Sequence, residues 1–278
     1  MENINEFLTK VLKVIVPDKK KEKRLKSLAN KVLRVANRKA KKYKAKAIIV
    51  GSITRDTWLP DKEEFDIFIL FPKHLTASQL EKYGLEVGKS IVKEMKGSFT
   101  LKYAQHPYLS AKIENVEIDI VPCYKIKDTS ELKSAVDRTP FHVAYLQNKL
   151  KKKQANEVRL LKKFLKNHNL YGADAKTQGF SGYLCELLII KYKNFVNLLK
   201  AASEWKVQEI IDLEEFYKKE EYDNLRKIFK NQCLIVIDPT DKNRNVAAAL
   251  SSENFFKFKK ISEEFLKNPC EETFFGKV

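Results

Sequence analysis

Three acidic residues lie in or next to apolar segments, where an uncompensated carboxylate is costly. Asp66 lies in the segment FDIFILF with Glu64 two positions before it, and Asp119 lies in the segment VEIDIVPC. Alternate residues of a strand face the same side, so Glu64 and Asp66 should project together. Asp119 joins them if its strand is a neighbour in the same sheet. Clustered carboxylates repel one another unless a cation compensates their charge.

An oxygen-rich group of this kind favours Mg²⁺, which also binds substrate phosphates. Two such ions support nucleotidyl transfer, because one lowers the pKa of the attacking hydroxyl and the other neutralises the triphosphate and the leaving pyrophosphate. We therefore predict that Glu64, Asp66 and Asp119 are both the catalytic residues and the metal ligands. The open alternative is that Asp66 and Asp119 lie on edge strands with their side chains in solvent.

A glycine–serine pair precedes these acids and suits phosphate binding. Gly51 and Ser52 follow the apolar segment KAIIV, and Arg55 comes one turn later. A Gly-Ser turn at a helix start offers backbone N–H groups and a hydroxyl to phosphate, and an arginine can reach the same anion. The Gly-Ser pair alone is weak evidence for phosphate binding. The pair followed in order by Arg55 and the three acids is strong evidence for a nucleotidyl-transfer site.

The elements that must position these residues follow from hydrophobic periodicity. We expect strands at 46–50, 65–71, 99–105, 108–114, 116–123 and 233–238, with a hairpin turn at Asn115. We expect helices at 3–15, 19–43, 77–95, 140–149, 154–168, 181–200, 244–250 and 252–267. This order predicts an α+β fold. Residues 1–137 form a head with a mixed or antiparallel five-stranded sheet and flanking helices, and residues 138–278 form a mostly helical second domain with a small β element.

Composition narrows the classes of partner. The chain has 278 residues and a formal net charge of +18, which favours a polyanion such as nucleic acid or an anionic membrane surface. The basic segment 19–43 has no Trp for a membrane anchor, so a membrane-surface protein ranks last. No apolar run reaches the length of a bilayer span and no signal peptide opens the chain, so we expect no membrane partner and a cytoplasmic location.

Other site chemistries find little support in the sequence. The four cysteines are widely spaced, without a C-x-x-C pair, so zinc is not expected and buried thiols are. The Gly-rich patterns of P-loop and Rossmann phosphate sites are absent from the sequence.

The pattern as a whole resembles the DNA polymerase β-like nucleotidyltransferase superfamily, and longer strings narrow the likeness. The chain resembles the archaeal, class I CCA-adding enzymes along essentially its whole length. The resemblance is carried by GSITRDTWLPDKEEFDIFILFP (51–72), HPY (106–108), EIDIVPCY (117–124), DRTPFH (137–142), NEVRLLKKFLK (156–166), LYGAD (170–174), GFSGYLCELLI (179–189) and RNVAAALS (244–251).

The resemblance implies further nucleotide-binding residues: Ser52 and Arg55 at the triphosphate, Thr139 and His142 near the ribose and phosphates, Lys162 and Tyr171 at the triphosphate from the second domain, Arg244 in base choice, and His106 lining the same pocket. Plainer interpretations stay open. Arg244 could merely pair with Asp241, Tyr171 could serve packing, the two histidines could be structural, and Gly179 and Gly182 could serve close packing.

The activity implied is addition of C, C and A to the tRNA 3′ end from CTP and ATP, without a nucleic-acid template and with release of pyrophosphate. A poly(A) polymerase or oligoadenylate synthetase type of terminal transferase is the alternative enzyme. A catalytically inactive RNA-binding subunit is the alternative outside enzymes.

The resemblance also implies a departure at the C-terminus, because family members continue well past Phe274. Three explanations stay open: a separate polypeptide supplies the C-terminal half, the chain acts alone, or the sequence is a fragment. A phenylalanine cluster would then be either an exposed docking surface or ordinary helix core. Its members are Phe255, Phe256, Phe258, Phe274 and Phe275.

Overall fold

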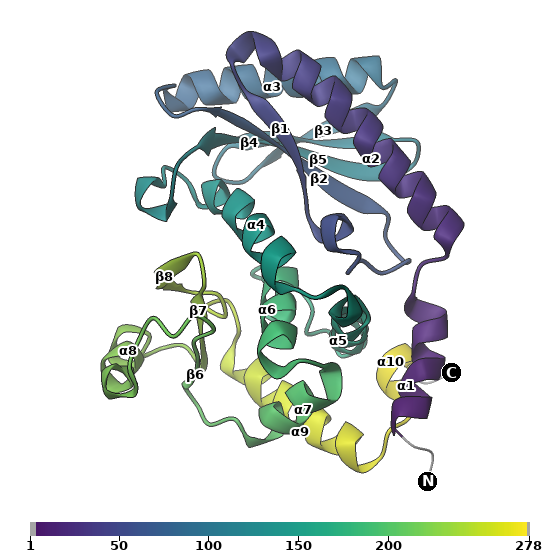
Figure 1. Ribbon diagram of the computed structural model, residues 1–278, viewed down its shortest axis with the longest axis vertical. Helices are drawn as coiled ribbons and strands as arrows, with labels where there is room; N and C mark the ends of the chain where they lie inside the picture. The colour runs from purple at the N-terminus through teal and green to yellow at the C-terminus, as the bar shows by residue number, and fades with distance from the viewer. Residues whose placement is uncertain (1–3, 277–278) are drawn as a thin grey trace. The chain divides into compact units, whose positions relative to one another are not determined.

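The computed structural model describes residues 4–276, which form two compact units (Figure 1). The first, here called the sheet unit, spans Pro17–Gln147. The second, here called the helical unit, combines the chain before Pro17 with the chain from Asn148 onward. This division follows residue 147, whereas the sequence led us to expect a domain boundary at residue 137; that expectation concerns the catalytic domains and stays a prediction.

A mixed five-stranded sheet forms the centre of the sheet unit, as predicted. Its order is β1-β2-β5-β4-β3, with β2 and β5 parallel and the other neighbours antiparallel. The strands are β1 (Lys46–Val50), β2 (Glu64–Pro72), β3 (Ser98–Tyr103), β4 (Pro107–Ile113) and β5 (Val116–Lys125). The predicted hairpin turn at Asn115 is confirmed, with positive φ angles at Glu114 and Asn115 between β4 and β5.

Two helices, α2 (Lys19–Ala40) and α3 (Ala77–Glu94), cover one face of this sheet (Figure 1). Alternate residues such as Ile67 of β2 and Ile118 of β5 are fully buried beneath them. The intervening residues therefore face the other side of the sheet, where Phe68 and Cys123 contact Val143 of α4 (Thr139–Lys149). Strand alternation thus places Asp66 and Asp119 on the face away from α2 and α3.

The helical unit packs its helices around a cluster of phenylalanine rings. Its longer helices are α1 (Ile4–Ile15), α5 (Ala155–Asn167), α6 (Gly182–Tyr192), α7 (Phe195–Glu204) and α9 (Ser252–Lys267). The rings in mutual contact are Phe7, Phe164, Phe195, Phe265 and Phe274. Phe7 of α1 and Phe274 of α10 (Glu272–Phe275) share this core, so the two ends of the described chain belong to one unit.

Most of the phenylalanine cluster predicted as a possible docking surface is core. Phe255, Phe258 and Phe274 are fully buried, whereas Phe256 and Phe275 keep 52% and 37% of their surfaces exposed. A docking role is therefore wrong for the three buried rings.

A small three-stranded sheet completes the helical unit. It has the order β6-β7-β8 and consists of β6 (Glu209–Ile211), β7 (Leu234–Asp238) and β8 (Asp241–Asn245), with α8 (Tyr222–Ile228) nearby in the chain. Short 3₁₀ turns link the larger elements of both units: η1 (Lys41–Tyr43), η2 (Ser52–Arg55), η3 (Thr129–Glu131), η4 (Ala135–Arg138), η5 (Lys152–Gln154) and η6 (Lys219–Glu221).

Two predicted helices are wrong. The expected helix 181–200 is broken into α6 and α7, because Lys193 takes a positive φ of 76° and the Asn194 side chain accepts a hydrogen bond from Asn197 N as the cap of α7. The expected helix 244–250 is instead strand β8 followed by turns. There the Asn245 side chain bonds the backbone of Leu234 and Val236, an alternative to helical hydrogen bonding.

No helix within residues 4–276 combines the length and the apolar character that crossing a bilayer requires.

Candidate active site

Asp66 and Asp119 stand directly opposite each other on neighbouring strands. In the parallel pairing of β2 with β5, Asp66 is the register partner of Asp119, and Glu64 is the partner of Glu117. Register partners on adjacent strands point to the same face of a sheet, with Cα atoms about 5 Å apart. The face away from α2 and α3 therefore carries four carboxylates in two adjacent pairs.

The surroundings of Asp66 disfavour its charge. Burial raises the pKa of this carboxyl to about 7, and the nearby charges of Asp119 and Glu64 act in the same direction. Lys62 opposes the shift. A carboxylate pair with an uncompensated charge and only oxygen donors is a donor set that suits Mg²⁺. These residues therefore fit a magnesium ion.

Glu64 is differently engaged. Its carboxylate pairs with the Lys62 ammonium, which also lies 3.3 Å from the Glu117 carboxylate. In this conformation no three His, Cys, Asp or Glu side chains of residues 4–276 gather closely enough to hold a metal ion. The structure thus brings Asp66 and Asp119 together and leaves Glu64 on the same face, bound to a lysine.

The Gly-Ser turn meets the acids at the end of β1. Gly51 has a φ of 86° and precedes η2, which starts at Ser52 and ends at Arg55. A Cβ atom at Gly51 would lie 3.1 Å from Asp66 Oδ2, so the backbone passes very close to this carboxylate. Ser52 and Arg55 are half-buried, and the Arg55 guanidinium donates to Thr54 Oγ1 at 2.6 Å. The turn that carries Ser52 and Arg55 is therefore adjacent to Asp66.

A pocket of about 250 Å³ opens beside the two aspartates. Asp66, Asp119, His106 and Tyr108 line it, together with the apolar residues Phe68, Ala104, Val121 and Val136. Burial and then the charges of Asp119 and Asp66 raise the pKa of Tyr108. His106 Nε2 is buried and meets no hydrogen-bond partner among the described residues, so it is a polar atom available to a ligand.

Thr139 and His142 belong to the first turn of α4, where both are half-buried. The start of this helix is fixed by the buried residue Asp137, whose carboxylate accepts from Tyr124 N of β5 at 2.8 Å and from Ser134 N at 2.8 Å. The DRTPFH string therefore ties α4 to the end of the strand that carries Asp119.

In the helical unit, Lys162 and Tyr171 come together near the start of α6. Lys162 keeps only 3% of its surface exposed. A Cβ atom on Gly182 would lie 3.1 Å from the Tyr171 hydroxyl and 3.9 Å from Lys162 Nζ, so the glycine permits this approach. Gly179 is a packing residue, because its Cβ would lie 2.1 Å from the Leu170 carbonyl oxygen.

Arg244 pairs with Asp238, and not with Asp241 as its plainer interpretation proposed. Its guanidinium lies 2.8 Å from the carboxylate of the fully buried Asp238, which also accepts from the hydroxyls of Tyr183 and Thr240. The plainer alternative for Arg244, a structural ion pair, is thus met by Asp238 rather than by Asp241. Arg244 is on β8 and Asp238 ends β7, so the antiparallel pair sets this contact.

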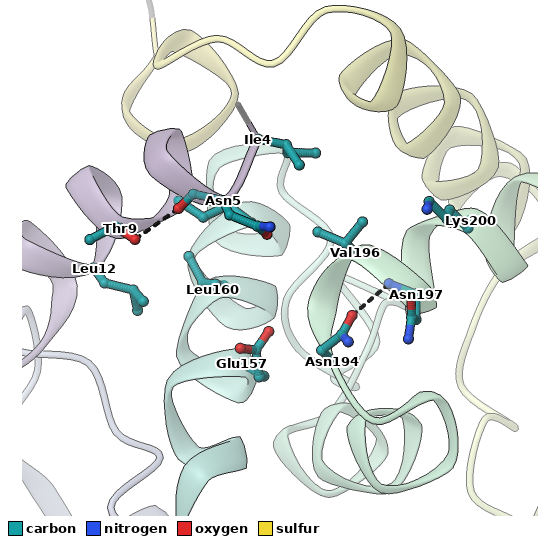
Figure 2. A pocket seen from close by; sticks show the side chains of 11 residues that line it. Ile4, Asn5, Thr9, Leu12, Glu157, Leu160, Asn194, Val196, Asn197 and Lys200 are labelled. Atoms are coloured by element: carbon teal, nitrogen blue, oxygen red, sulfur yellow. Dashed lines mark hydrogen bonds between the residues drawn. The ribbon is translucent and has the colours of Figure 1, made fainter. Parts of the chain in front are cut away.

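A larger pocket in the helical unit has no pair of carboxylates like Asp66 and Asp119 among its described lining residues (Figure 2). It is about 470 Å³ and lies among α1, α5 and the start of α7. Among the described residues that line it, Glu157 is the one with a carboxylate, and Glu157 Oε2 already accepts from Phe195 N at 2.9 Å. Size alone does not make this pocket a catalytic site.

Four side chains of the site escaped the sequence analysis. Glu117 could have been found, because it stands two positions before Asp119 and so shares its face. Lys62, Tyr108 and Ser110 could not, since their contacts with the acids depend on strand register and on a loop conformation. Ser110 of β4 donates its hydroxyl to Asp119 Oδ1 at 2.6 Å.

Comparisons with known proteins agree with this geometry. Residues 29–142 match the family described as nucleotidyltransferase domain, and residues 156–275 match the family described as tRNA nucleotidyltransferase, second domain. The chain is 43% identical over 277 residues to the CCA-adding enzyme of Methanocaldococcus jannaschii, covering 98% of this chain and 61% of that protein. It is 40% identical over 266 residues to the CCA-adding enzyme of Archaeoglobus fulgidus, covering 96% of this chain and 56% of that protein.

The chain thus spans about three fifths of the length of these curated relatives. Among solved structures, an RNA terminal uridylyl transferase superposes with a TM-score of 0.72 over 96% of this chain and 95% of its own. At 10% sequence identity this likeness shows the fold alone.

Proposed function

Because the chain belongs to the nucleotidyltransferase family that includes the archaeal CCA-adding enzymes, we propose that it adds C, C and A to the 3′ end of tRNA. The substrates are CTP, ATP and a tRNA that lacks its terminal nucleotides. The tRNA 3′-hydroxyl attacks the α-phosphate of each nucleotide in turn, and pyrophosphate leaves. No protein nucleophile takes part.

The main support is the side-by-side placement of Asp66 and Asp119 on one sheet face, beside the Gly51 turn. We propose that these two aspartates hold Mg²⁺ together with Glu64, which first leaves Lys62. Bound Mg²⁺ supplies activation of the attacking hydroxyl and charge neutralisation at the phosphates. The residues of the chain orient the ion, because β2 and β5 fix both aspartates in one register.

We further propose nucleotide contacts from both units. Ser52 and Arg55 bind the triphosphate from the turn next to Asp66, and Lys162 and Tyr171 bind it from the helical unit. His106 in the pocket beside the acids and Thr139 and His142 at the start of α4 contact the nucleotide or the RNA end. Arg244, oriented by its ion pair with Asp238, contributes to selection of the base of the incoming nucleotide. In these terms residues 1–137 form the catalytic head and residues 138–278 the domain that selects the nucleotide.

Incorporation of labelled CTP and ATP into a tRNA transcript ending before CCA tests the proposal. Sequencing of the products should show C, C and A in that order, with the tRNA extended by no other nucleotide. Addition of A alone would favour a poly(A) polymerase or oligoadenylate synthetase type of activity. Binding of tRNA without any incorporation would favour an inactive RNA-binding subunit.

The curated relatives are longer, so the proposal that a separate C-terminal polypeptide assists this chain remains a prediction. Repeating the incorporation assay with the corresponding segment of a relative added in trans addresses it directly. A rise in incorporation with that segment supports the prediction, and an unchanged rate contradicts it.

A further inference from the structure

We infer that Ser110 is a positioning residue that fixes the Asp119 carboxylate for metal binding, a role that rests on the function proposed above. None of the sequence motifs singled out this serine. Its position follows from the pairing of β4 with β5, where Ser110 is the register partner of Asp119. The two side chains therefore project from the same face of the sheet, on the side away from α2 and α3.

The contact between them is short and directional. Ser110 Oγ lies 2.6 Å from Asp119 Oδ1, within the normal range for a hydroxyl donating to a carboxylate. Both residues are half-buried, so solvent competes less for this bond than it does at an exposed site. The bond engages one lone pair of Oδ1, and the remaining lone pairs of the carboxylate can accept from a cation.

The neighbours of Asp119 explain why such a bond is needed. Asp66 faces Asp119 across the strand pair, and two carboxylates at this separation repel each other. A free aspartate side chain would rotate about χ1 and χ2 to move its oxygens apart. The hydroxyl opposes that rotation, because Ser110 itself is held in the interior strand β4 between β5 and β3.

Asp66 differs from Asp119 in this respect. Within residues 4–276, no hydrogen bond to the Asp66 carboxylate is found, and Asp66 instead lies against the Gly51 backbone. One aspartate is thus fixed by a donor and the other by close packing. A cation that binds both carboxylates therefore finds Asp119 already oriented, which reduces the ordering cost of binding.

A purely structural role for Ser110 predicts a different result. If Ser110 served only to satisfy a half-buried carboxylate, its loss would change stability and leave the affinity for metal unaltered. A pair of similarly shaped replacements separates the two roles, because Ser110→Thr keeps a hydroxyl and Ser110→Val does not. Both side chains are β-branched and suit a strand interior.

The test measures Mn²⁺ binding to the full chain by electron paramagnetic resonance, alongside steady-state incorporation of CTP. Loss of a hydrogen bond to a metal-binding group typically costs 10–100-fold, so Ser110→Val should raise the Mn²⁺ dissociation constant about tenfold or more. It should lower kcat by a similar factor and leave KM for CTP within about twofold, whereas Ser110→Thr should stay close to wild type in all three.

Ser90→Ala provides a matched control, because the Ser90 hydroxyl donates to Val87 O at 2.7 Å within α3, on the opposite side of the sheet. It should leave Mn²⁺ binding unchanged. Equal Mn²⁺ affinity in wild type and Ser110→Val would overturn the inference, as would equal loss in the Thr and Val variants or failure of the wild type to bind Mn²⁺. If the wild type binds Mn²⁺ and does not incorporate CTP, the proposed function fails while the binding comparison still decides the role of Ser110.

Discussion

At the scale of single residues, the candidate site places carboxylates that repel one another side by side, and the Gly51 backbone packs closely against one of them, Asp66. Asp66 is half-buried, and desolvation together with the nearby charges of Asp119 and Glu64 raises the pKa of its carboxyl to about 7. Lys62 offsets part of this repulsion by pairing with Glu64 and Glu117. The ionised form of Asp66 is therefore disfavoured unless a proton or a cation compensates its charge.

The raised pKa of Asp66 predicts a specific pH dependence of stability in protein stripped of divalent ions. The folded protein keeps a proton on Asp66 up to about pH 7, whereas the unfolded chain loses it near 3.8. The stabilisation linked to this proton is complete below the unfolded value and is lost as pH rises through the folded value. Between about pH 4 and pH 7 it should decline by at most a few kcal/mol.

Chemical denaturation of wild type and Asp66→Asn in EDTA isolates this contribution, since asparagine does not titrate. The stability difference between the two proteins should shift in favour of the variant as the pH rises. Addition of Mg²⁺ should restore stability to the wild type at neutral pH and have less effect on the variant. A stability difference that stays constant with pH would contradict the assignment of the raised pKa to Asp66.

Gly51 gives a second prediction at this scale. Gly51→Ala must hold a φ of 86° and place a Cβ atom 3.1 Å from Asp66 Oδ2. We expect it to lower stability by about 1 kcal/mol and incorporation of CTP by more than about tenfold. Gly276→Ala is the matched control, because Gly276 also has a positive φ, and among residues 4–276 its Cβ would approach just Asn167 Oδ1, at 3.6 Å. Equal activity losses in the two variants would refute a local effect on Asp66.

At the scale of elements, β2 and β5 determine the site because they are adjacent and parallel. The same pairing that aligns Asp66 with Asp119 buries Ile67 and Ile120 beneath α2 and α3 on the opposite face. Slippage of one residue would reverse both faces at once, so the hydrophobic core enforces the register on which the acids depend.

Close packing of α3 on the sheet supports this register. A Cβ atom on Gly84 would lie 2.5 Å from Pro122 Cβ of β5, and one on Gly88 would lie 2.7 Å from Leu109 Cδ1 of β4. The proline ring is rigid, whereas the end of the leucine side chain can move aside. Alanine also gains about 1 kcal/mol of helix propensity over glycine at either position.

Gly84→Ala should therefore destabilise the protein by about 1–3 kcal/mol through overpacking, while Gly88→Ala should be close to neutral. Thermal denaturation of the two variants, each compared with wild type, measures this difference. A larger loss for Gly88→Ala than for Gly84→Ala would show that α3 does not pack on β5 as closely as described.

The sequence predicted these elements well where periodicity was strong. The apolar run FDIFILF predicted β2 and the segment VEIDIVPC predicted β5. Because alternate residues of a strand face the same side, the sequence also placed Glu64 and Asp66 on one face of β2. It could not predict that the two strands are neighbours, because pairing joins segments far apart in the chain. The break at Lys193 was missed because both flanking segments are apolar and helix-forming. Strand β8 was missed because the alanines that follow it favour helix, while Asn245 in fact hydrogen-bonds the neighbouring strand.

The sequence could not predict contacts made by flexible side chains. The pairing of Glu64 with Lys62 depends on the loop before β2, and the hydrogen bond from Ser110 depends on the β4–β5 register. Arg244 has two acids within six positions, and only the hairpin geometry selects Asp238 over Asp241.

At the scale of the whole molecule, the chain has a net charge of +18, and some of its basic side chains are paired with acids while others are not. The basic helix α2 was expected to present either a solvated face or a phosphate-binding face. Much of its charge is paired with acids of the sheet unit: Arg24 with Glu63, Lys26 with Asp56, Lys31 with Glu114, and Arg38 and Lys39 with Glu94. Most of the excess positive charge available to a polyanion therefore lies elsewhere on the chain.

The excess predicts RNA binding that weakens steeply with salt. Each phosphate contact made by lysine or arginine releases counterions, so affinity should fall about tenfold between 50 and 200 mM salt for every two contacts. Filter binding of a tRNA transcript over this range gives the number of contacts. Because Arg38 is already paired, Arg38→Gln should change the slope little, and an affinity independent of salt would contradict a role for phosphate contacts.

The most direct test of the account compares two acids on the same strand and the same face. Asp119→Asn should abolish single-turnover incorporation of labelled CTP into tRNA lacking its 3′ end. Circular dichroism should show that this variant keeps the folded structure. Glu117→Gln lies two residues away, and among residues 4–276 the Glu117 carboxylate forms an ion pair with Lys62 alone, so this variant should keep most of the wild-type rate. Retention of the wild-type rate by Asp119→Asn, or equal loss in both variants, would contradict the claim that paired aspartates on β2 and β5 perform nucleotidyl transfer.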